Sequence, residues 1–286
     1  MKIVGLMLVR NEDWVLKASV NAALRWCDSL LMYFDRCTDD SVNIVRDMAD
    51  GRHVECMYGG FASHWDEMDV RQRMLEQGRA MGGTHFAIID GDEILTHNNL
   101  RFIRFHFEKL QPGQLLEVPM IPVWDSLGKF RNDGSGWYHN RLTLGFRDND
   151  GKTLAWKAAE DGYQHHARPP KGTTGEIHRP IGLGPLGGVM HLQFANRRRL
   201  LAKHVLYRMV DHLRWPGRRT VERLNQIYDD ALSTPGHFTS IPEDWWGDYP
   251  KDKIVLDGVP WQEDEIRRLL SEHGRDTFKG LDLKGF

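Results

Sequence analysis

The chain has 286 residues, of which 41% are hydrophobic and 27% are charged, so it is long enough for a large α/β domain with its own core. Its formal net charge of −2 excludes a strong overall attraction to nucleic acids or anionic membranes, and leaves only a local basic groove open. Charged residues interrupt every apolar run well before the roughly 18 residues that a membrane span needs. We therefore expect one α/β body with a helical tail and no membrane span.

The cysteines and the first residues bear on the location of the protein. Cys27, Cys37 and Cys56 are an odd number of cysteines without metal-ligand spacing, which fits reduced thiols and gives no support to a disulfide framework. Residues 1–10 resemble a signal peptide, but charged residues follow them at once and no small-residue cleavage site follows. The sequence therefore predicts a cytoplasmic protein.

Two strand–helix units are predicted at the start of the chain. A strand at Ile3–Val9 leads through polar residues into a helix over 14–26. A second strand, Ser29–Phe34, ends at Asp35 and leads into a helix over 41–50. Polar groups thus meet two helix starts, whose free backbone N–H groups and positive dipole ends suit an anionic or polar ligand.

A third unit continues the alternation. A weak strand over 53–58 precedes a helix over 64–81, which carries three arginines among apolar residues, and a new strand begins at His85. Strands that alternate with helices in this way are typical of a doubly wound, mostly parallel sheet.

The strand that begins at His85 carries the most informative motif. Residues 86–89 are an unbroken apolar run, which suits a strand buried on both faces, and Asp90, Gly91 and Asp92 follow it. Because side chains alternate along an extended chain, Asp90 and Asp92 leave the strand end on the same side. Ligands of open α/β sheets lie outside the carboxyl ends of the strands, so this pair predicts a magnesium or manganese ion that carries a diphosphate. The alternative is a polar turn that closes the strand.

These segments, in this order, resemble the family 2 glycosyltransferases with the GT-A fold over about residues 1–100. The resemblance rests on VRNED after the first strand, on Asp35, Thr38 and Asp39 in a D-x-x-T-D pattern, on the arginine-bearing helix and on the DxD motif. It implies a GT-A-like α/β fold and a transferase that inverts the anomeric carbon of a nucleotide sugar, with a UDP-sugar favoured as donor. The implied cofactor is Mn²⁺ or Mg²⁺, because a cation stabilises the departing diphosphate more in the transition state than in the ground state.

The resemblance also implies roles for individual residues. Asp92 is the expected direct metal ligand, while Asp90 serves the ribose and the metal. Arg73 is expected to support the donor site. Thr38 is also a good N-cap residue, so capping is an equal interpretation of it. The nucleotide base and ribose are expected at Val9, Arg10, Asn11, Glu12, Asp35 and Thr38.

The middle of the chain is expected to form the acceptor side. A helix is predicted over 98–110 and a strand over 115–123, whose two prolines favour the edge of a sheet. Residues 124–138, rich in glycine, aspartate and aromatic residues, are either a loop that stacks on the acceptor or an ordinary surface loop. Strands over 142–147 and 154–158 are expected to pair about a tight turn.

The chemistry also needs a general base, a carboxylate within hydrogen-bond reach of the acceptor hydroxyl. In the resembling family this base is an acid late in the fold, often within an acidic pair, which implies Asp161 with Glu160 as the reserve. Asp125 and Asp133 are also available.

A glycine-rich segment precedes a candidate metal ligand. Residues 182–187 match G-x-G-x-x-G, but no strand precedes them and Pro185 disrupts the turn, so we reject a dinucleotide site. We expect a mobile loop there, of a kind that often closes over a nucleotide, followed by a strand over 188–194. His191 in that strand is either a core residue or, as the resemblance implies, a late ligand of the metal.

Two basic segments have alternative interpretations. His165, His166 and Arg168 lie ahead of two prolines, where an exposed turn is favoured over a ligand site. Arg198 belongs to a run of three arginines, which is either a solvated face or a contact to the diphosphate.

The last part of the chain is predicted to be helical, over 196–213, 218–232 and 262–273. The expected organisation is a donor-binding half at 1–100, an acceptor and catalytic half of the same domain at 101–195, and a helical C-terminal extension at 196–286.

Three functions follow from these patterns. The leading prediction is a metal-dependent inverting glycosyltransferase, whose acceptor is a hydroxyl of a glycan, a lipid, a protein or a modified DNA base. A nucleotidyltransferase on a similar sheet should carry a glycine-rich, arginine-containing loop after the first strand, and VRNED is no such loop. A non-catalytic module that binds sugar or nucleic acid is the other alternative.

Overall fold

The computed structural model describes residues 1–49, 53–59, 66–133, 140–149, 153–157, 168–180, 187–233 and 236–286. The chain divides into two compact units. The first, here the sheet unit, comprises residues 1–121, 139–191 and 242–255. The second, here the helical unit, comprises residues 122–138, 192–241 and 256–286. Among the described helices, none has the length and apolar character needed to cross a membrane.

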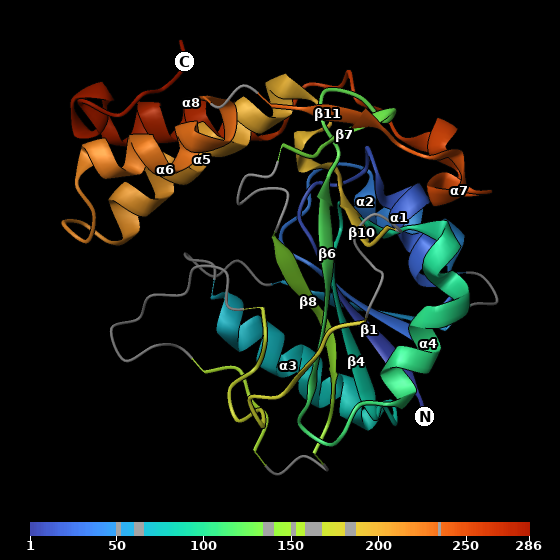
Figure 1. Ribbon diagram of the computed structural model, residues 1–286. Coiled ribbons are helices and arrows are strands. Elements are labelled where there is room, and N and C mark those ends of the chain that lie inside the picture. Colours follow the sequence, from blue (N-terminus) through green and yellow to red (C-terminus); the bar gives the residue numbers. More distant parts are fainter. Residues whose placement is uncertain are drawn as a thin grey trace. The chain divides into compact units, whose positions relative to one another are not determined.

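A large, mostly parallel sheet forms the centre of the sheet unit (Figure 1). The strand order is β3-β2-β1-β4-β8-β6-β10-β5, and β9 pairs with β6. Neighbours among β1 to β4 are parallel, whereas β8 is antiparallel to both β4 and β6. The expected α/β fold class is confirmed. The strands are β1 Ile3–Val9, β2 Ser29–Phe34, β3 Val54–Tyr58, β4 His85–Asp90, β5 Glu93–Leu95, β6 Leu115–Pro122, β8 Arg141–Arg147, β9 Ile177–His178 and β10 Val189–His191.

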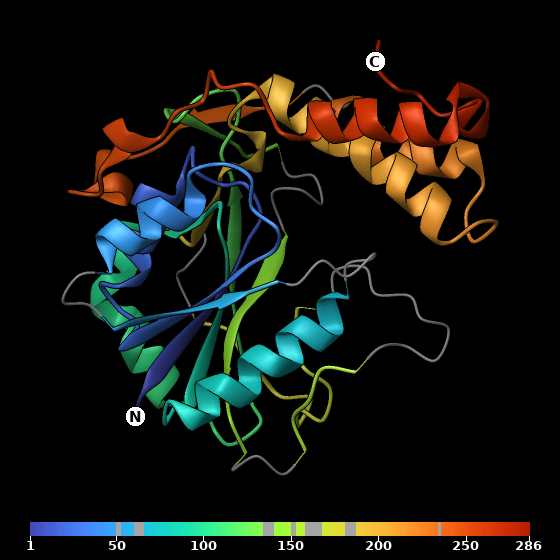
Figure 2. The ribbon, with the colours of Figure 1, turned by 180° about the vertical axis from the view of Figure 1, so that it is seen from behind.

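Helices cover both faces of this sheet (Figure 2). On one face α1, α2 and α4 bury residues such as Val20, Val45 and Phe107 against the strands. On the other face α3 buries Met74 and Leu75. Helices on both faces explain why the central strands read as unbroken apolar runs. The helices of this unit are α1 Leu16–Ala23, α2 Ser41–Met48, α3 Glu67–Ala80, α4 Leu100–Glu108, α7 Glu243–Trp246 and the 3₁₀ helices η1 His97–Asn99 and η3 Lys251–Lys253.

The register of the parallel strands brings their carboxyl ends to one edge. Leu8 of β1 lies opposite Asp90 of β4, and Val9 lies opposite Phe34 of β2. The polar residues that follow β1, β2 and β4 are therefore neighbours in space. This edge is where an open α/β sheet binds its ligands.

Two predictions about the antiparallel part are wrong. β6 is an inner strand with β8 and β10 as neighbours, not an edge strand. Its prolines are accommodated because the register with β8 ends at Pro119 and Pro122 lies beyond it, so neither missing N–H interrupts the middle of that ladder. The expected hairpin does not form either, since β8 pairs with β4 and β6, while Ala155 bridges Lys171.

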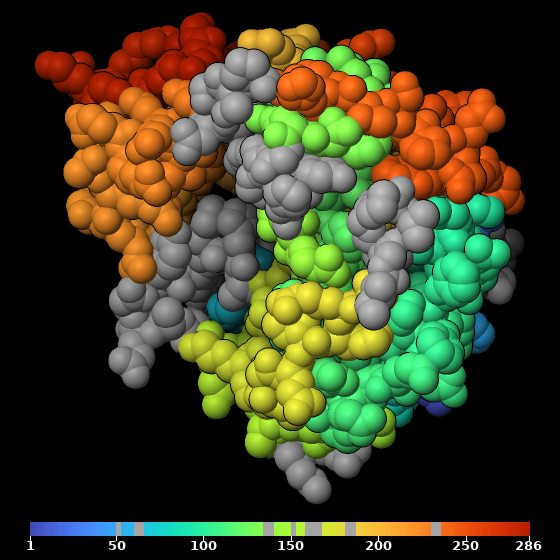
Figure 3. All heavy atoms as spheres, viewed as in Figure 1, coloured from blue at the N-terminus to red at the C-terminus, as the bar shows by residue number. Residues whose placement is uncertain are grey.

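The segment 168–180, yellow in Figure 3, lies beside α4 on the face shown there. Nδ1 of His106 in α4 and Nε2 of His178 in β9 are 3.1 Å apart. This contact and the pairing of β9 with β6 anchor the segment to the sheet unit.

The helical unit is built around α5, which packs against α6 and α8. Its core contains Val205, Met209, Leu224 and Ile266. A two-stranded ribbon of β7 and β11 completes it. The helices predicted over 196–213, 218–232 and 262–273 are confirmed as α5, α6 and α8. The elements are β7 Lys129–Arg131, η2 Leu192–Phe194, α5 Arg197–Arg214, α6 Val221–Ser233, β11 Phe238–Ser240, α8 Gln262–His273 and η4 Arg275–Phe278.

Candidate active site

The loops that follow β1 and β2 are tied together by Asn11. Its backbone has a φ of 55°, in the left-handed region that asparagine tolerates better than most residues. Its Oδ1 accepts hydrogen bonds from the backbone N–H groups of Thr38 at 2.7 Å and Asp39 at 3.4 Å, and its Nδ2 donates to Thr38 Oγ1 at 3.2 Å. Asn11 and Thr38 therefore shape the edge of the site.

Asp35 is a buried carboxylate at the end of β2. Arg36 forms two hydrogen bonds with it, of 2.9 and 3.1 Å, and Arg10 Nη1 lies 3.3 Å from Asp35 Oδ2. The backbone N–H of Asp35 donates to the carbonyl of Val9 at 2.8 Å. The end of β2 thus presents one acceptor group flanked by two guanidinium groups, which suits a ligand with both donor groups and negative charge.

Glu12 closes the loop after β1 over the DxD turn. Its backbone N–H donates to Ser41 Oγ at 3.0 Å, and its carboxylate accepts from Trp14 Nε1 at 2.5 Å. A Cβ at Gly91 would lie 3.1 Å from Glu12 Cγ, which is tighter than ordinary contact. A glycine between the two aspartates therefore allows these segments to meet closely.

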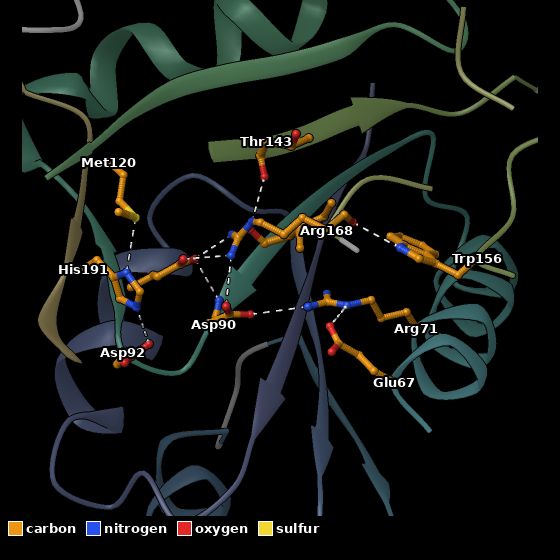
Figure 4. A network of polar contacts seen from close by, with 11 residues as sticks. Glu67, Arg71, Asp90, Asp92, Met120, Thr143, Trp156, Arg168 and His191 are labelled. Atoms are coloured by element: carbon orange, nitrogen blue, oxygen red, sulfur yellow. Dashed lines mark hydrogen bonds and ion pairs between the residues drawn. The ribbon is translucent and has the colours of Figure 1, made fainter. Parts of the chain in front are cut away.

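Asp90 is held by two arginines (Figure 4). Arg168 Nη1 lies 3.0 Å from Asp90 Oδ2, and Arg71 Nη2 lies 3.7 Å from Asp90 Oδ1. Burial alone would raise the pKa of Asp90, but Arg168 and then Arg71 outweigh it and hold the pKa below the ordinary value. Asp90 is therefore ionised at neutral pH.

Arg71 and Arg73, two residues apart on α3, have different surroundings. Arg71 is buried, and its Nε donates to Glu67 at 2.8 Å. Arg73 is half exposed, pairs with Asp69 at 3.0 Å and donates to Tyr33 Oη at 3.2 Å. Because α-helical positions two residues apart point about 200° apart, only Arg71 is directed to the DxD motif.

Asp92 lies beside His191, as Figure 4 shows. Asp92 is buried, and its Oδ1 is 3.5 Å from His191 Nε2. The antiparallel pairing of β10 with β5 places the histidine there, while its Nδ1 is 3.4 Å from Met120 Sδ. Two adjacent ligand atoms of one octahedral ion are about 3 Å apart. Asp92 Oδ1 and His191 Nε2 therefore need a shift of roughly half an ångström to reach that geometry.

The chemistry of the donor set fits a divalent cation. The ion pairs around the DxD motif join four carboxylates (Glu67, Asp90, Asp92 and Glu93) and two guanidinium groups (Arg71 and Arg168), whose formal charges leave two negative charges in excess. Within the described parts of the chain, no group of three or more histidine, cysteine or acidic side chains is arranged for a metal. The fit to a divalent cation therefore rests on the Asp92 carboxylate, the His191 imidazole and the excess negative charge. Oxygen atoms of water or of a ligand would take the remaining coordination positions.

Other predicted site residues belong to the helical unit or fall outside the described residues. Arg198 is in the helical unit, where its Nε donates to Glu263 at 2.6 Å. Asp133 is paired with Arg131 at 2.5 Å in the same unit. Glu160 and Asp161, the histidines at 165 and 166, and residues 182–186 of the glycine-rich segment fall outside the described residues.

Asp90 of the DxD motif has three partners that the sequence does not predict, namely Arg168, Glu93 and Arg71. Arg168 was expected in an exposed turn, yet its side chain is only 17% exposed and it contacts residues about 75 positions away. No local sequence pattern predicts a contact between Arg168 and Glu93. Glu93 follows the motif directly, and the i,i+4 spacing of Glu67 and Arg71 was visible in the sequence.

The fold and this site together define a mixed α/β protein with an acidic, arginine-lined site at the carboxyl ends of parallel strands. Similar solved structures include S. aureus TarS in complex with UDP-GlcNAc, with a TM-score of 0.45 and 13% identity, over 99% of this chain and 82% of that chain. A longer S. aureus TarS structure matches over 98% of this chain, with a TM-score of 0.44 and 13% identity. This chain spans 50% of the length of that structure.

A second kind of structure matches part of the chain. It is glucosyl-3-phosphoglycerate synthase from Mycobacterium tuberculosis in complex with Mn²⁺, UDP and phosphoglyceric acid, with a TM-score of 0.31 and 17% identity, over 42% of this chain and 43% of that chain. No protein-family model matches the sequence, and neither does any curated protein. At these identities and TM-scores the likeness assigns neither a family nor an activity to this chain.

Proposed function

We propose that this protein is a metal-dependent inverting glycosyltransferase, which moves a sugar from a nucleotide-diphosphate donor to an acceptor hydroxyl. The observation that carries the proposal is the pair of the buried Asp92 and His191, whose side chain is 13% exposed, within a network that has two excess negative charges. It lies where the carboxyl ends of β1, β2 and β4 meet, the place at which such sheets bind nucleotides.

Each group near this edge has a task in the proposed reaction. Asp92 and His191 would hold Mn²⁺ or Mg²⁺, which neutralises the negative charge that grows on the diphosphate as it departs. Asp35 and Asp90 would accept hydrogen bonds from the base and the ribose. Arg10, next to Asp35, adds positive charge on the nucleotide side. The sequence resemblance favours a UDP-sugar as donor.

The transfer itself is a single displacement. The acceptor oxygen attacks the anomeric carbon, the bond from that carbon to the diphosphate oxygen breaks, and the hydroxyl proton passes to a carboxylate base. Asp161, with Glu160 as the reserve, is proposed as this base on the resemblance alone. Attack from the side opposite the leaving group inverts the configuration. The acceptor is a hydroxyl of a glycan, a lipid, a protein or a modified DNA base.

Calorimetric titration with UDP tests the proposal. We expect UDP to bind about tenfold or more tightly with Mn²⁺ than in the presence of EDTA, because the cation links the diphosphate to Asp92. A screen of nucleotide sugars for hydrolysis should then release the nucleotide from one donor. UDP affinity that is equal with and without metal, together with no hydrolysis of any donor, would favour the non-catalytic sugar- or nucleic-acid-binding module.

The two arginines of α3 provide a paired prediction. We expect Arg71→Ala to weaken Mn²⁺-dependent UDP binding about 10–100-fold, because a group that orients a ligand-binding side chain typically has this effect. Arg73→Ala should change the affinity less than about twofold, since exposed ion pairs contribute little. Calorimetry on both variants, with circular dichroism as the check on folding, measures the difference. Equal losses in the two variants would contradict the placement of Arg71 at the donor site.

A further inference from the structure

The guanidinium group of Arg168 is fully engaged by the end of the DxD strand. Its Nη1 and Nη2 donate to the two carboxylate oxygens of Glu93 at 2.8 and 2.7 Å, and Nη1 also contacts Asp90 at 3.0 Å. Nη2 donates to the carbonyl of Ile88 at 2.7 Å, and Nε donates to the carbonyl of Thr143 at 3.1 Å. All three nitrogens therefore have partners, on β4, β5 and β8.

This arrangement differs from an ordinary surface ion pair. Glu93 is 2% exposed at its side chain, and its carboxylate also accepts from the backbone N–H of Asp90 at 3.0 Å. Removing one partner of such a buried pair leaves an uncompensated charge, which costs far more than losing an exposed pair. The planar fork of arginine suits the two oxygens of one carboxylate, which lysine cannot reproduce.

Arg168 also acts on the metal site through charge. Its guanidinium group contacts Asp90 at 3.0 Å and Glu93 at 2.7 and 2.8 Å, the residues two before and one after Asp92. A positive charge at this position lowers the negative potential at Asp92. Without it, the four carboxylates of the network would face one guanidinium group instead of two.

We propose that Arg168 is a positioning residue that sets the charge and the ligand number of the metal site. By holding Asp90 in an ion pair it keeps that carboxylate from turning to the cation, and it limits the excess charge to what one divalent ion balances. The inference rests on the proposed function, since it assumes that Asp92 binds the metal.

Binding of Mn²⁺ alone, followed by the electron paramagnetic resonance signal of the free ion, tests this role. We expect Arg168→Gln to bind Mn²⁺ about tenfold more tightly than the wild type, because a positive charge near the cation is lost. Glu93→Gln should bind it about tenfold more weakly for the opposite reason. The double variant Arg168→Gln/Glu93→Gln keeps the original net charge but no longer holds Asp90, so its Mn²⁺ affinity should recover partway, to between those of Arg168→Gln and the wild type.

Matched variants separate this effect from simple damage. Arg79 forms a similar bidentate pair with Asp148 away from the DxD motif, so Arg79→Gln should leave Mn²⁺ affinity unchanged. Arg168→Lys keeps the positive charge that pairs with Asp90, so its Mn²⁺ affinity should also stay close to that of the wild type. If Arg168→Gln does not fold, the Mn²⁺ affinities of Glu93→Gln and of the double variant still test the charge effect.

The role of Arg168 and the proposed metal site would be rejected by different results. If the wild type binds Mn²⁺ through Asp92 but Arg168→Gln binds it equally or more weakly, or the double variant does not recover, the role of Arg168 is overturned. If Asp92→Asn leaves Mn²⁺ binding unchanged in the wild-type background, the proposed metal site itself fails.

Discussion

Asp92→Asn is expected to abolish glycosyl transfer while leaving the fold intact. Asparagine has nearly the same shape, so the buried site keeps its packing, but the ligand charge that holds the cation is lost. We expect the turnover number to fall about 10³-fold or more, equivalent to ~4 kcal/mol of transition-state stabilisation. Asp92→Ala should have at least the same effect. Turnover and Mn²⁺ affinity should fall together, and the midpoint of thermal unfolding should change little.

The control for this prediction is an aspartate of the same unit outside the site. Asp69 on α3 is exposed and pairs with the half-exposed Arg73, so Asp69→Asn should retain activity. Retained turnover in Asp92→Asn would contradict the metal role. A loss of circular dichroism in that variant would instead assign Asp92 to stability, and comparison of the two variants separates these outcomes.

The largest expected effect on stability is that of Gly145→Ala. Gly145 lies in β8 between Ala87 of β4 and Leu116 of β6, in the middle of the sheet. A Cβ there would be 2.4 Å from the carbonyl oxygen of Phe86 and 2.7 Å from the ring of Phe107. Because backbone and a packed aromatic ring cannot both move aside, we expect a loss of about 3 kcal/mol in the free energy of unfolding.

Thermal or urea unfolding of Gly145→Ala measures this loss. Gly128→Ala is the matched control, because its added Cβ would have Ser126 Oγ at 3.8 Å as its nearest neighbour. That variant should unfold within about 0.5 kcal/mol of the wild type. An unchanged unfolding midpoint for Gly145→Ala would show that β8 can shift away from β4, and would contradict the close packing described here.

The sequence by itself determined the alternating strands and helices and the position of the DxD motif. A strand buried on both faces needs a continuous apolar run, and a helix needs apolar residues with its own period, so β1, β2, β4 and α8 were evident from local pattern. The acidic residues at the strand ends were equally visible. Since parallel strands place their carboxyl ends at one edge, the common location of Asp35, Asp90 and Asp92 followed from the fold class.

Only the tertiary structure decided which charges meet and which strands are internal. Arg168 and Asp90 are far apart in the chain, and no periodicity links them, because their contact depends on how separate strands assemble. Arg71 was distinguished from Arg73 by the rotation of α3, which the spacing of arginines did not define. β6 is internal despite its prolines because its register with β8 ends at Pro119, so that ladder does not need the missing N–H groups. Local sequence sets the elements, whereas the contacts between distant elements set the charge balance of the site.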